Sequence, residues 1–232
     1  MVVACFVVGV VVGSLLNWAG DYLARFASVR PARSSPRLTL AVWHLVTSRA
    51  ASRRLGPLGL NSAVELGAGL LLVLLWERLG FSCKYLYTTA ACLFFLLIAI
   101  VDLKHQLVLN VLVYPVAAIT LLVHSVPPGR ETLVTLLGGT LGLAPFLAAA
   151  LLKPEGIGAG DVKLAALIGL MVGFPEVMAA LIVAVMAGGG TALVLLLTRR
   201  WKLESHIPYA PFLCLGAVFS LVYAPSSLLF PR

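Results

Sequence analysis

The stretch Cys92-Leu-Phe-Phe-Leu-Leu-Ile-Ala-Ile-Val101 places ten apolar side chains in a row and ends on a single acid, Asp102. It lies in an apolar segment near 86–102, and a helix needs about 20 such residues to cross a bilayer core of about 30 Å. Seven other segments follow the same pattern. We therefore predict an all-α, polytopic membrane protein of about eight transmembrane helices, near 1–24, 62–79, 86–102, 108–126, 131–152, 157–174, 176–198 and 208–225.

The composition supports lipid as the solvent of this chain. Of its 232 residues, 61% are hydrophobic and 11% are charged, whereas soluble domains are about 45–50% apolar and about 25% charged. One water-soluble core of this size could not bury so much apolar surface. The four cysteines form no Cys-x-x-Cys pair and no metal-ligand spacing, so we interpret them as small buried apolar side chains and predict no metal site.

The positive charges predict an orientation. The net charge is +8, and thirteen of the seventeen lysines and arginines fall on one side of the eight predicted helices. Basic loops stay on the cytoplasmic side, which places both termini outside. Seven arginines fall in residues 25–60, which we interpret as a basic cytoplasmic loop between a first transmembrane helix (1–24) and a transmembrane core (61–232). No aromatic interleaving accompanies these arginines, so we predict no nucleic-acid binding.

Two of the nine acidic residues stand where an ionisable group is costly and is functional by default. Asp102 follows the apolar run above, and Asp161 follows three glycines in Gly156-Ile-Gly-Ala-Gly-Asp161. Both are predicted at the cytoplasmic ends of their helices, so they can meet in one leaflet. Two adjacent carboxylates share one proton, and such a pair can activate a water and protonate a peptide carbonyl. Gly158 and Gly160 would let non-helical backbone approach a partner or substrate closely.

Spacing alone leaves other interpretations open. The two aspartates could be unrelated interfacial acids, with Asp161 capping a helix in a glycine-rich loop. They could also bind a cation in a polytopic transporter or cation-coupled carrier, because glycine-broken helices are typical of carriers. We find no internal repeat, however, and both acids are predicted at helix ends rather than at the bilayer midplane.

Five ordered segments resemble the type IV prepilin peptidase family, whose members are polytopic aspartic proteases of the Gly-x-Gly-Asp type. The segment holding the second acid is similar to the family's Gly-x-Gly-Asp-Val-Lys-Leu. The others resemble Gly-Ser-Phe-Leu-Asn, Val-Glu-Leu, Ile-Asp-Leu before Pro-Asn, and Ile-Pro-Phe-Gly-Pro before Leu-Gly-Ala. In chain order the five are Gly13–Asn17, Val64–Leu66, Val101–Leu103 with Asn110, Gly158–Leu164, and Ile207–Phe212 with Leu215–Ala217.

The resemblance implies an aspartic endopeptidase that removes the short basic leader of type IV prepilins or pseudopilins. It implies a multi-pass protein of the bacterial cytoplasmic membrane, with its active site at the cytoplasmic face and with Asp102 and Asp161 as the catalytic pair. Proteolysis would need no cofactor. Many relatives bind zinc through two Cys-x-x-Cys pairs in the first loop, and residues 25–60 hold no cysteine. Zinc is therefore not expected, and methylation with S-adenosylmethionine is doubtful.

Other residues are candidates for shaping the site or binding substrate. Lys163 would act on Asp161 or meet an acidic substrate group, although a lysine here can also extend to the interface. Glu65 would contact the substrate leader, or it would only favour the dipole at a helix start. The resemblance adds Asn110, and it departs at Leu109, where the family usually has proline. Gly188-Gly189-Gly190 predicts close helix packing, or a flexible gate.

Overall fold

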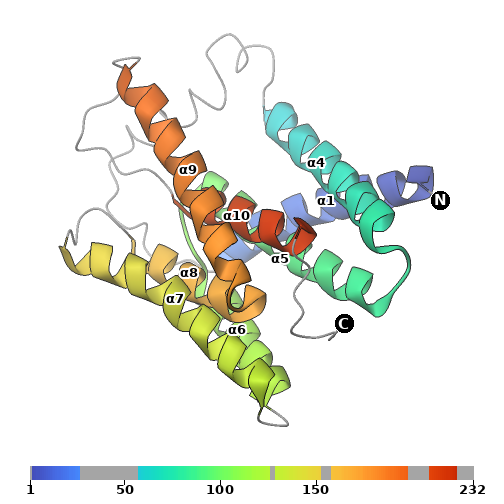
Figure 1. Cartoon of the computed structure of the whole chain (residues 1–232). Coiled ribbons are helices and arrows are strands. Elements are labelled where there is room, and N and C mark those ends of the chain that lie inside the picture. Colours follow the sequence, from blue (N-terminus) through green and yellow to red (C-terminus); the bar gives the residue numbers. More distant parts are fainter. Residues whose placement is uncertain (1, 27–56, 126–128, 153–157, 198–208, 224–232) are drawn as a thin grey trace. The chain divides into compact units, whose positions relative to one another are not determined.

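A computed structural model of the chain describes residues 2–26, 57–125, 129–152, 158–197 and 209–223. Over these residues the backbone forms helices and no strand (Figure 1). Each of the eight apolar segments predicted above contains one helix, so the all-α fold class is confirmed. The helices are α1 (Val2–Phe26), α4 (Pro57–Leu79), α5 (Cys83–His105), α6 (Asn110–Ser125), α7 (Arg130–Leu152), α8 (Ala159–Val172), α9 (Glu176–Leu197) and α10 (Ala210–Tyr223).

Within the described residues, four stretches are long and apolar enough to cross a membrane: Val2–Ala24, Cys83–His105, Arg130–Leu152 and Glu176–Val194. The helices α6 and α10 are apolar but shorter. At 1.5 Å per residue, the 14 residues of α8 and of α10 extend about 20 Å each, less than a bilayer core of about 30 Å. The chain is a polytopic membrane protein, while the number of eight crossings stays a prediction.

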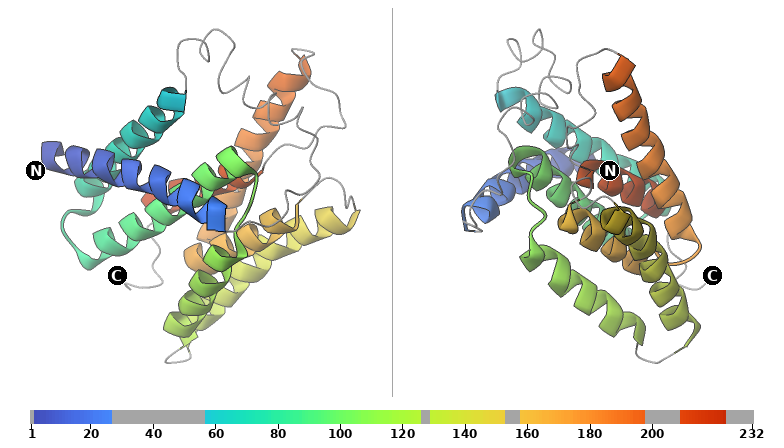
Figure 2. Two further views of the ribbon diagram at one scale, coloured as in Figure 1. Left: turned by 180° about the vertical axis from the view of Figure 1, so that it is seen from behind. Right: turned by 90° about the vertical axis from the view of Figure 1, so that its left-hand side faces the viewer.

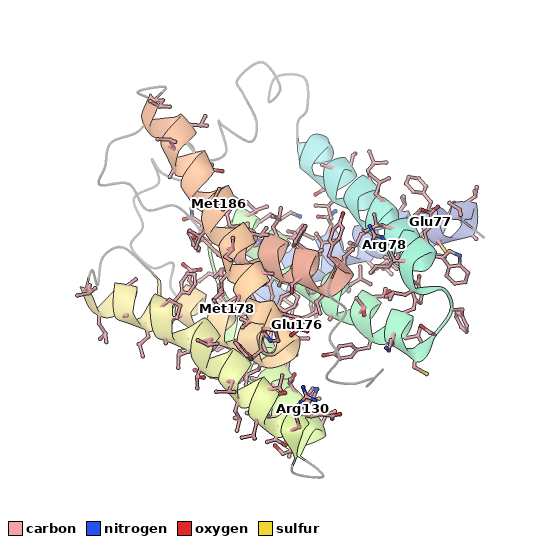
Figure 3. The ribbon with its side chains drawn as sticks, viewed as in Figure 1. Glu77, Arg78, Arg130, Glu176, Met178 and Met186 are labelled. Carbon is pink, nitrogen blue, oxygen red and sulfur yellow. The ribbon has the colours of Figure 1, made fainter. Side chains whose placement is uncertain are left out.

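Large apolar side chains cover much of the molecular surface. Leu151 is 73% exposed, Phe81 is 79% exposed, and Met186 is 70% exposed. Figure 3 shows Met178 and Met186 projecting from α9, with Glu176 at the start of that helix. Exposed apolar side chains in such number are costly in water but are solvated by lipid tails, as the composition predicted.

The structure divides into two compact units, residues 1–77 with 189–207 and residues 78–188 with 208–232. In the first unit, Gly9 and Gly13 of α1 bring its backbone against α4, and a Cβ added to Gly9 would lie 2.6 Å from the Cα of Gly69. The side-chain amide of Asn17 donates to the carbonyl of Asn61 at 3.3 Å. Most of the predicted loop 25–60 lies outside the described residues, so the division into 1–24, 25–60 and 61–232 stays a prediction.

The second unit is held together mainly by glycines between α7 and α8, which lie side by side (Figures 1 and 2). A Cβ added to Gly138, Gly142 or Gly169 would collide with a backbone carbonyl oxygen of the facing helix. The two backbones therefore approach as closely as small residues allow in membrane helices. The helix α10 packs against both α5 and α8, and α6 packs against α7 and α8.

Candidate active site

Asp102 lies in the last turn of α5 and is 5% exposed. Its backbone carbonyl accepts the N–H of Gln106 at 2.8 Å, and Gln106 closes the helix in the left-handed conformation with φ 53°. Its Oδ2 atom is buried and has no hydrogen-bond partner among the described residues. A buried carboxyl oxygen without a hydrogen-bond partner costs stability, which makes Asp102 a candidate for a functional rather than a structural role.

Asp161 lies in the first turn of α8, three residues after the N-cap Gly158. Glycine offers no side chain to cap the helix, and the Asp161 carboxylate instead accepts the backbone N–H of Gly158. This is the reciprocal half of a capping box. The same carboxylate accepts the N–H of Ala210, the first residue of α10. The positive ends of two helices therefore meet at Asp161.

The structure brings the two aspartates together, as the sequence predicted. Asp102 lies close enough to Asp161 for their charges to interact. The thiol of the buried Cys214, on α10, also lies close enough to both acids for their charges to act on it. The interacting acids thus belong to α5 and α8, and α10 packs against both of these helices.

Lys163 and Asn110 also meet, although their positions are 53 residues apart in the chain. The Lys163 ammonium donates to the Asn110 Oδ1 atom at 3.2 Å and stands 5.3 Å from the ring centre of Tyr114. These contacts join α8 to the first turns of α6. The lysine therefore faces Asn110 and Tyr114 rather than forming an ion pair with Asp161 among the described residues.

The two glycines before Asp161 differ in their surroundings. A Cβ added to Gly160 would lie 2.9 Å from the Cβ of Val108, so this glycine lets the segment after α5 touch α8. At Gly158 the nearest such atom is the Asp161 Oδ2 atom, at an ordinary 3.5 Å. The predicted close approach is thus found at Gly160.

Glu65 lies in the first unit, on the side of α4 that faces α1. A Cβ added to Gly13 would lie 2.8 Å from the Cα of Glu65. The second unit, by contrast, contains all the other predicted site residues. A contact between Glu65 and the substrate therefore stays a prediction.

Tyr209 is a site residue that sequence reasoning did not single out. Its ring lies 5.5 Å from that of Phe146, and its hydroxyl donates to the carbonyl of Ala184 at 3.4 Å. Its own carbonyl accepts the N–H groups of Phe212 and Leu213, so it fixes the start of the helix whose first amide binds Asp161. The only sequence signal was its place in the segment Ile207–Phe212, to which no role was given.

Among the described residues, no group of three or more His, Cys, Asp or Glu side chains could hold a metal ion. The predicted absence of zinc concerned the loop 25–60, which lies mostly outside those residues. It therefore stays a prediction.

Comparison with known proteins identifies the part of the chain that holds both acids. Residues 89–193 match the model of the type IV leader peptidase family. This segment is similar to a type IV leader peptidase domain. It includes Asp102, Asp161, Lys163 and Asn110, whereas α10 follows it in the chain.

Curated relatives agree with the leader peptidase domain. A prepilin leader peptidase/N-methyltransferase of Bacillus subtilis is 24% identical over 238 residues, which covers 97% of this chain and 95% of the relative. One of the same name from Burkholderia pseudomallei is 35% identical over 69 residues, which covers 30% of this chain and 22% of the relative. No solved structure matches.

Proposed function

We propose that this protein is an aspartic endopeptidase that removes the leader peptide of type IV prepilins or pseudopilins, with Asp102 and Asp161 as its catalytic pair. The observation that carries the proposal is the interaction between these two acids, from different helices, within one leader peptidase domain. Unrelated interfacial acids would have no reason to converge, because bringing two carboxylates together is costly.

The surroundings of the two acids suggest different roles. Asp161 accepts two backbone N–H groups at helix starts, which stabilise a carboxylate. It is the better general base, and it would take a proton from the attacking water. Asp102 is deeply buried with one oxygen unpartnered, so it is the better general acid. It would donate its proton to the scissile carbonyl oxygen as the water attacks, which gives a tetrahedral gem-diol. Asp161 would then give the proton it took from water to the leaving nitrogen, the C–N bond would break, and Asp102 would take a proton back from one of the gem-diol hydroxyls.

The membrane setting suits a substrate with a polar leader and an apolar helix, because the helix can stay in lipid while the leader stays in water. We place the protein in the bacterial cytoplasmic membrane with its site at the cytoplasmic face, following the basic loops. The relatives are named as N-methyltransferases as well. We propose proteolysis without a cofactor for this chain, and methylation with S-adenosylmethionine is not part of the proposal.

The comparisons give no support to the alternative of a transporter or cation-coupled carrier. An inactive relative that only binds pilins is the remaining alternative. Both acids are present and converge, which favours an active enzyme.

The test is cleavage of a co-expressed type IV prepilin, read by mass spectrometry of the product. Asp102→Asn and Asp161→Asn should each reduce cleavage at least about a thousandfold, since each removes one half of the acid–base pair. The product mass also reports whether a methyl group is added.

Glu131→Gln is the matched control, because Glu131 is an exposed carboxylate in the first turn of α7. It should cleave as well as the wild type. Full cleavage by either aspartate variant would remove that residue from the pair. If the wild type cleaved none of the prepilins offered, the proposed function itself would be overturned.

A further inference from the structure

The chain between α5 and α6 runs through Gln106–Leu109 without helix or turn. Figure 2 shows this connector as a stretched trace between the two helices. Gln106 is left-handed and the Leu109 carbonyl accepts the first amides of α6, so Leu107 and Val108 form the central part of the connector. Two residues of extended backbone reach at most about 7 Å, which is enough to lie beside about two residues of another extended peptide.

The central backbone groups of this connector have no hydrogen-bond partner within the part of the chain that the structure describes. The N–H of Gln106 binds the Asp102 carbonyl, and the carbonyl of Leu109 accepts the first amides of α6. The N–H and carbonyl groups of Leu107 and Val108 make no hydrogen bond with any described residue. Both residues are half-buried. Irregular backbone of this kind is tolerated in membrane proteins where it lines a water-filled space or is met by a partner.

The connector lies beside both acids. It begins four residues after Asp102, and Val108 touches α8 at Gly160, the residue directly before Asp161. A peptide lying along Leu107 and Val108 would therefore pass close to both carboxyl groups.

We propose that the substrate binds as an extended strand that pairs with the backbone of Leu107 and Val108. The inference rests on the proposed function, and it adds the conformation that the substrate must adopt. Strand addition supplies affinity through main-chain hydrogen bonds, which any sequence can make. A substrate helix must unwind at its junction before cleavage, because a helical segment has no free N–H groups to offer.

Strand geometry sets the pattern of contacts. Successive residues of a strand turn their N–H and carbonyl groups to opposite edges. Either Leu107 or Val108, but not both, therefore presents its pair to the peptide. The peptide uses alternate residues in the same way, so its important amides are separated by an unimportant one.

The experiment is an amide-to-ester scan of a synthetic peptide that spans the leader junction of a type IV prepilin, with the full-length protein in detergent micelles. Each amide from four residues before to four after the scissile bond is replaced in turn by an ester, which removes one N–H donor, and the scissile bond itself is left intact. One or two alternating positions should raise KM about fivefold to tenfold with little change in kcat. Their neighbours should change KM less than about twofold.

Gly160→Ala tests the same contact from the enzyme, because its new Cβ would push Val108 and the connector away from α8. The ester-sensitive positions should lose their effect, since a displaced edge no longer forms those hydrogen bonds. Gly67→Ala is the control, because a Cβ at Gly67 meets nothing within 4 Å among the described residues. That variant should keep the wild-type pattern.

The ester scan and the Gly160→Ala variant can each overturn a different part of the proposal. Strand pairing is overturned if KM is the same at every ester position, or if esters at consecutive positions all raise KM. Cleavage of the peptide would still support the proposed function. A wild-type pattern in Gly160→Ala overturns the placement at this connector. Failure of the wild type to cleave the unmodified peptide overturns the proposed function, and this inference with it.

Discussion

The two halves of α8 meet their surroundings in opposite ways. Its second half, around Gly169, touches α7 through glycines, where no side chain separates the backbones. Its first half carries Asp161 and Lys163, whose polar groups are met by helix starts and by one asparagine. One short helix therefore holds both the closest packing and the most polar site of the second unit.

The difference teaches how a membrane protein positions a costly site. Packing between membrane helices depends on close approach, since lipid gives apolar side chains no reason to prefer one another. The glycine contact of α7 and α8 provides that approach. The interacting acids and the unpartnered Oδ2 of Asp102 cost stability, and the close-packed half of the same helix offsets that cost. Stability and activity should thus respond in opposite directions to changes in the two halves.

Asp102→Leu should give the largest effect, because it changes the acid of α5 that interacts with Asp161 in the polar half of α8. We expect cleavage of a prepilin peptide to fall at least about a thousandfold. We expect the free energy of unfolding to rise by about 1 kcal/mol, because an apolar side chain of similar size replaces a buried carboxyl with an unpartnered oxygen. Thermal unfolding in micelles and a peptide cleavage assay measure the two quantities.

The same substitution at an exposed acid gives the control for Asp102→Leu. Glu131→Leu should change neither quantity, since Glu131 lies exposed in the first turn of α7. If Asp102→Leu destabilised the protein strongly, the carboxyl would be satisfied by structural contacts, and the view that the paired acids cost stability would be wrong.

Gly169→Ala should give the next largest effect, on stability alone. Its Cβ would collide with the carbonyl of Gly138 across the helix contact. Overpacking of this kind costs about 1–3 kcal/mol, and here backbone rather than a movable side chain must shift. Thermal unfolding in micelles measures the loss, and the folded fraction should keep its cleavage activity per molecule. An unchanged unfolding temperature would mean that α7 and α8 can separate freely.

Much of this contrast could be predicted from the sequence. The apolar runs predicted the eight helices of the described residues, because lipid exposure makes length and hydropathy the dominant signals. Asp102 and Asp161 were predicted as a pair because each interrupts an apolar pattern at the same predicted membrane face. The meeting of Lys163 with Asn110 was not predicted, since it depends on the crossing of α6 and α8, which no local pattern encodes.

The glycines show the limit of sequence reasoning most clearly. The run Gly188-Gly189-Gly190 predicted close helix packing or a flexible gate. At Gly188 a Cβ would lie 2.8 Å from the ring of Tyr209, so this glycine makes room for an aromatic side chain, and close helix packing stays a prediction. At Gly189 and Gly190 a Cβ meets nothing within 4 Å among the described residues. Adjacent helical positions point 100° apart, so only a known partner helix tells which glycine faces it.

Gly188→Ala and Gly189→Ala make a matched pair with a moderate expected effect. The first should displace the Tyr209 ring and with it the Ala210 amide that binds Asp161, lowering kcat about tenfold. KM should change little, because this substitution leaves the backbone of Leu107 and Val108, where the substrate would pair, unchanged. The second should keep wild-type kcat and raise the free energy of unfolding by about 0.5 kcal/mol, as alanine favours a helix. Cleavage kinetics and thermal unfolding check both, and equal kcat in the two variants would contradict the role of Tyr209.

The smallest expected effect concerns the polar contact between α8 and α6. Lys163→Met and Asn110→Ala should each lower the free energy of unfolding by less than about 1 kcal/mol, because the hydrogen bond is exposed. In a double-mutant cycle we expect a coupling of about 0.5 kcal/mol, and Lys163→Arg should keep part of it.

The same double-mutant cycle shows whether the contact between Lys163 and Asn110 serves stability or catalysis. Coupling in stability alone would mean that the contact only holds the first turns of α8 and α6 together. A larger coupling in kcat/KM would mean that it also positions the connector Gln106–Leu109 beside the two acids. Because that connector ends at Leu109, one residue before Asn110, we expect the second result.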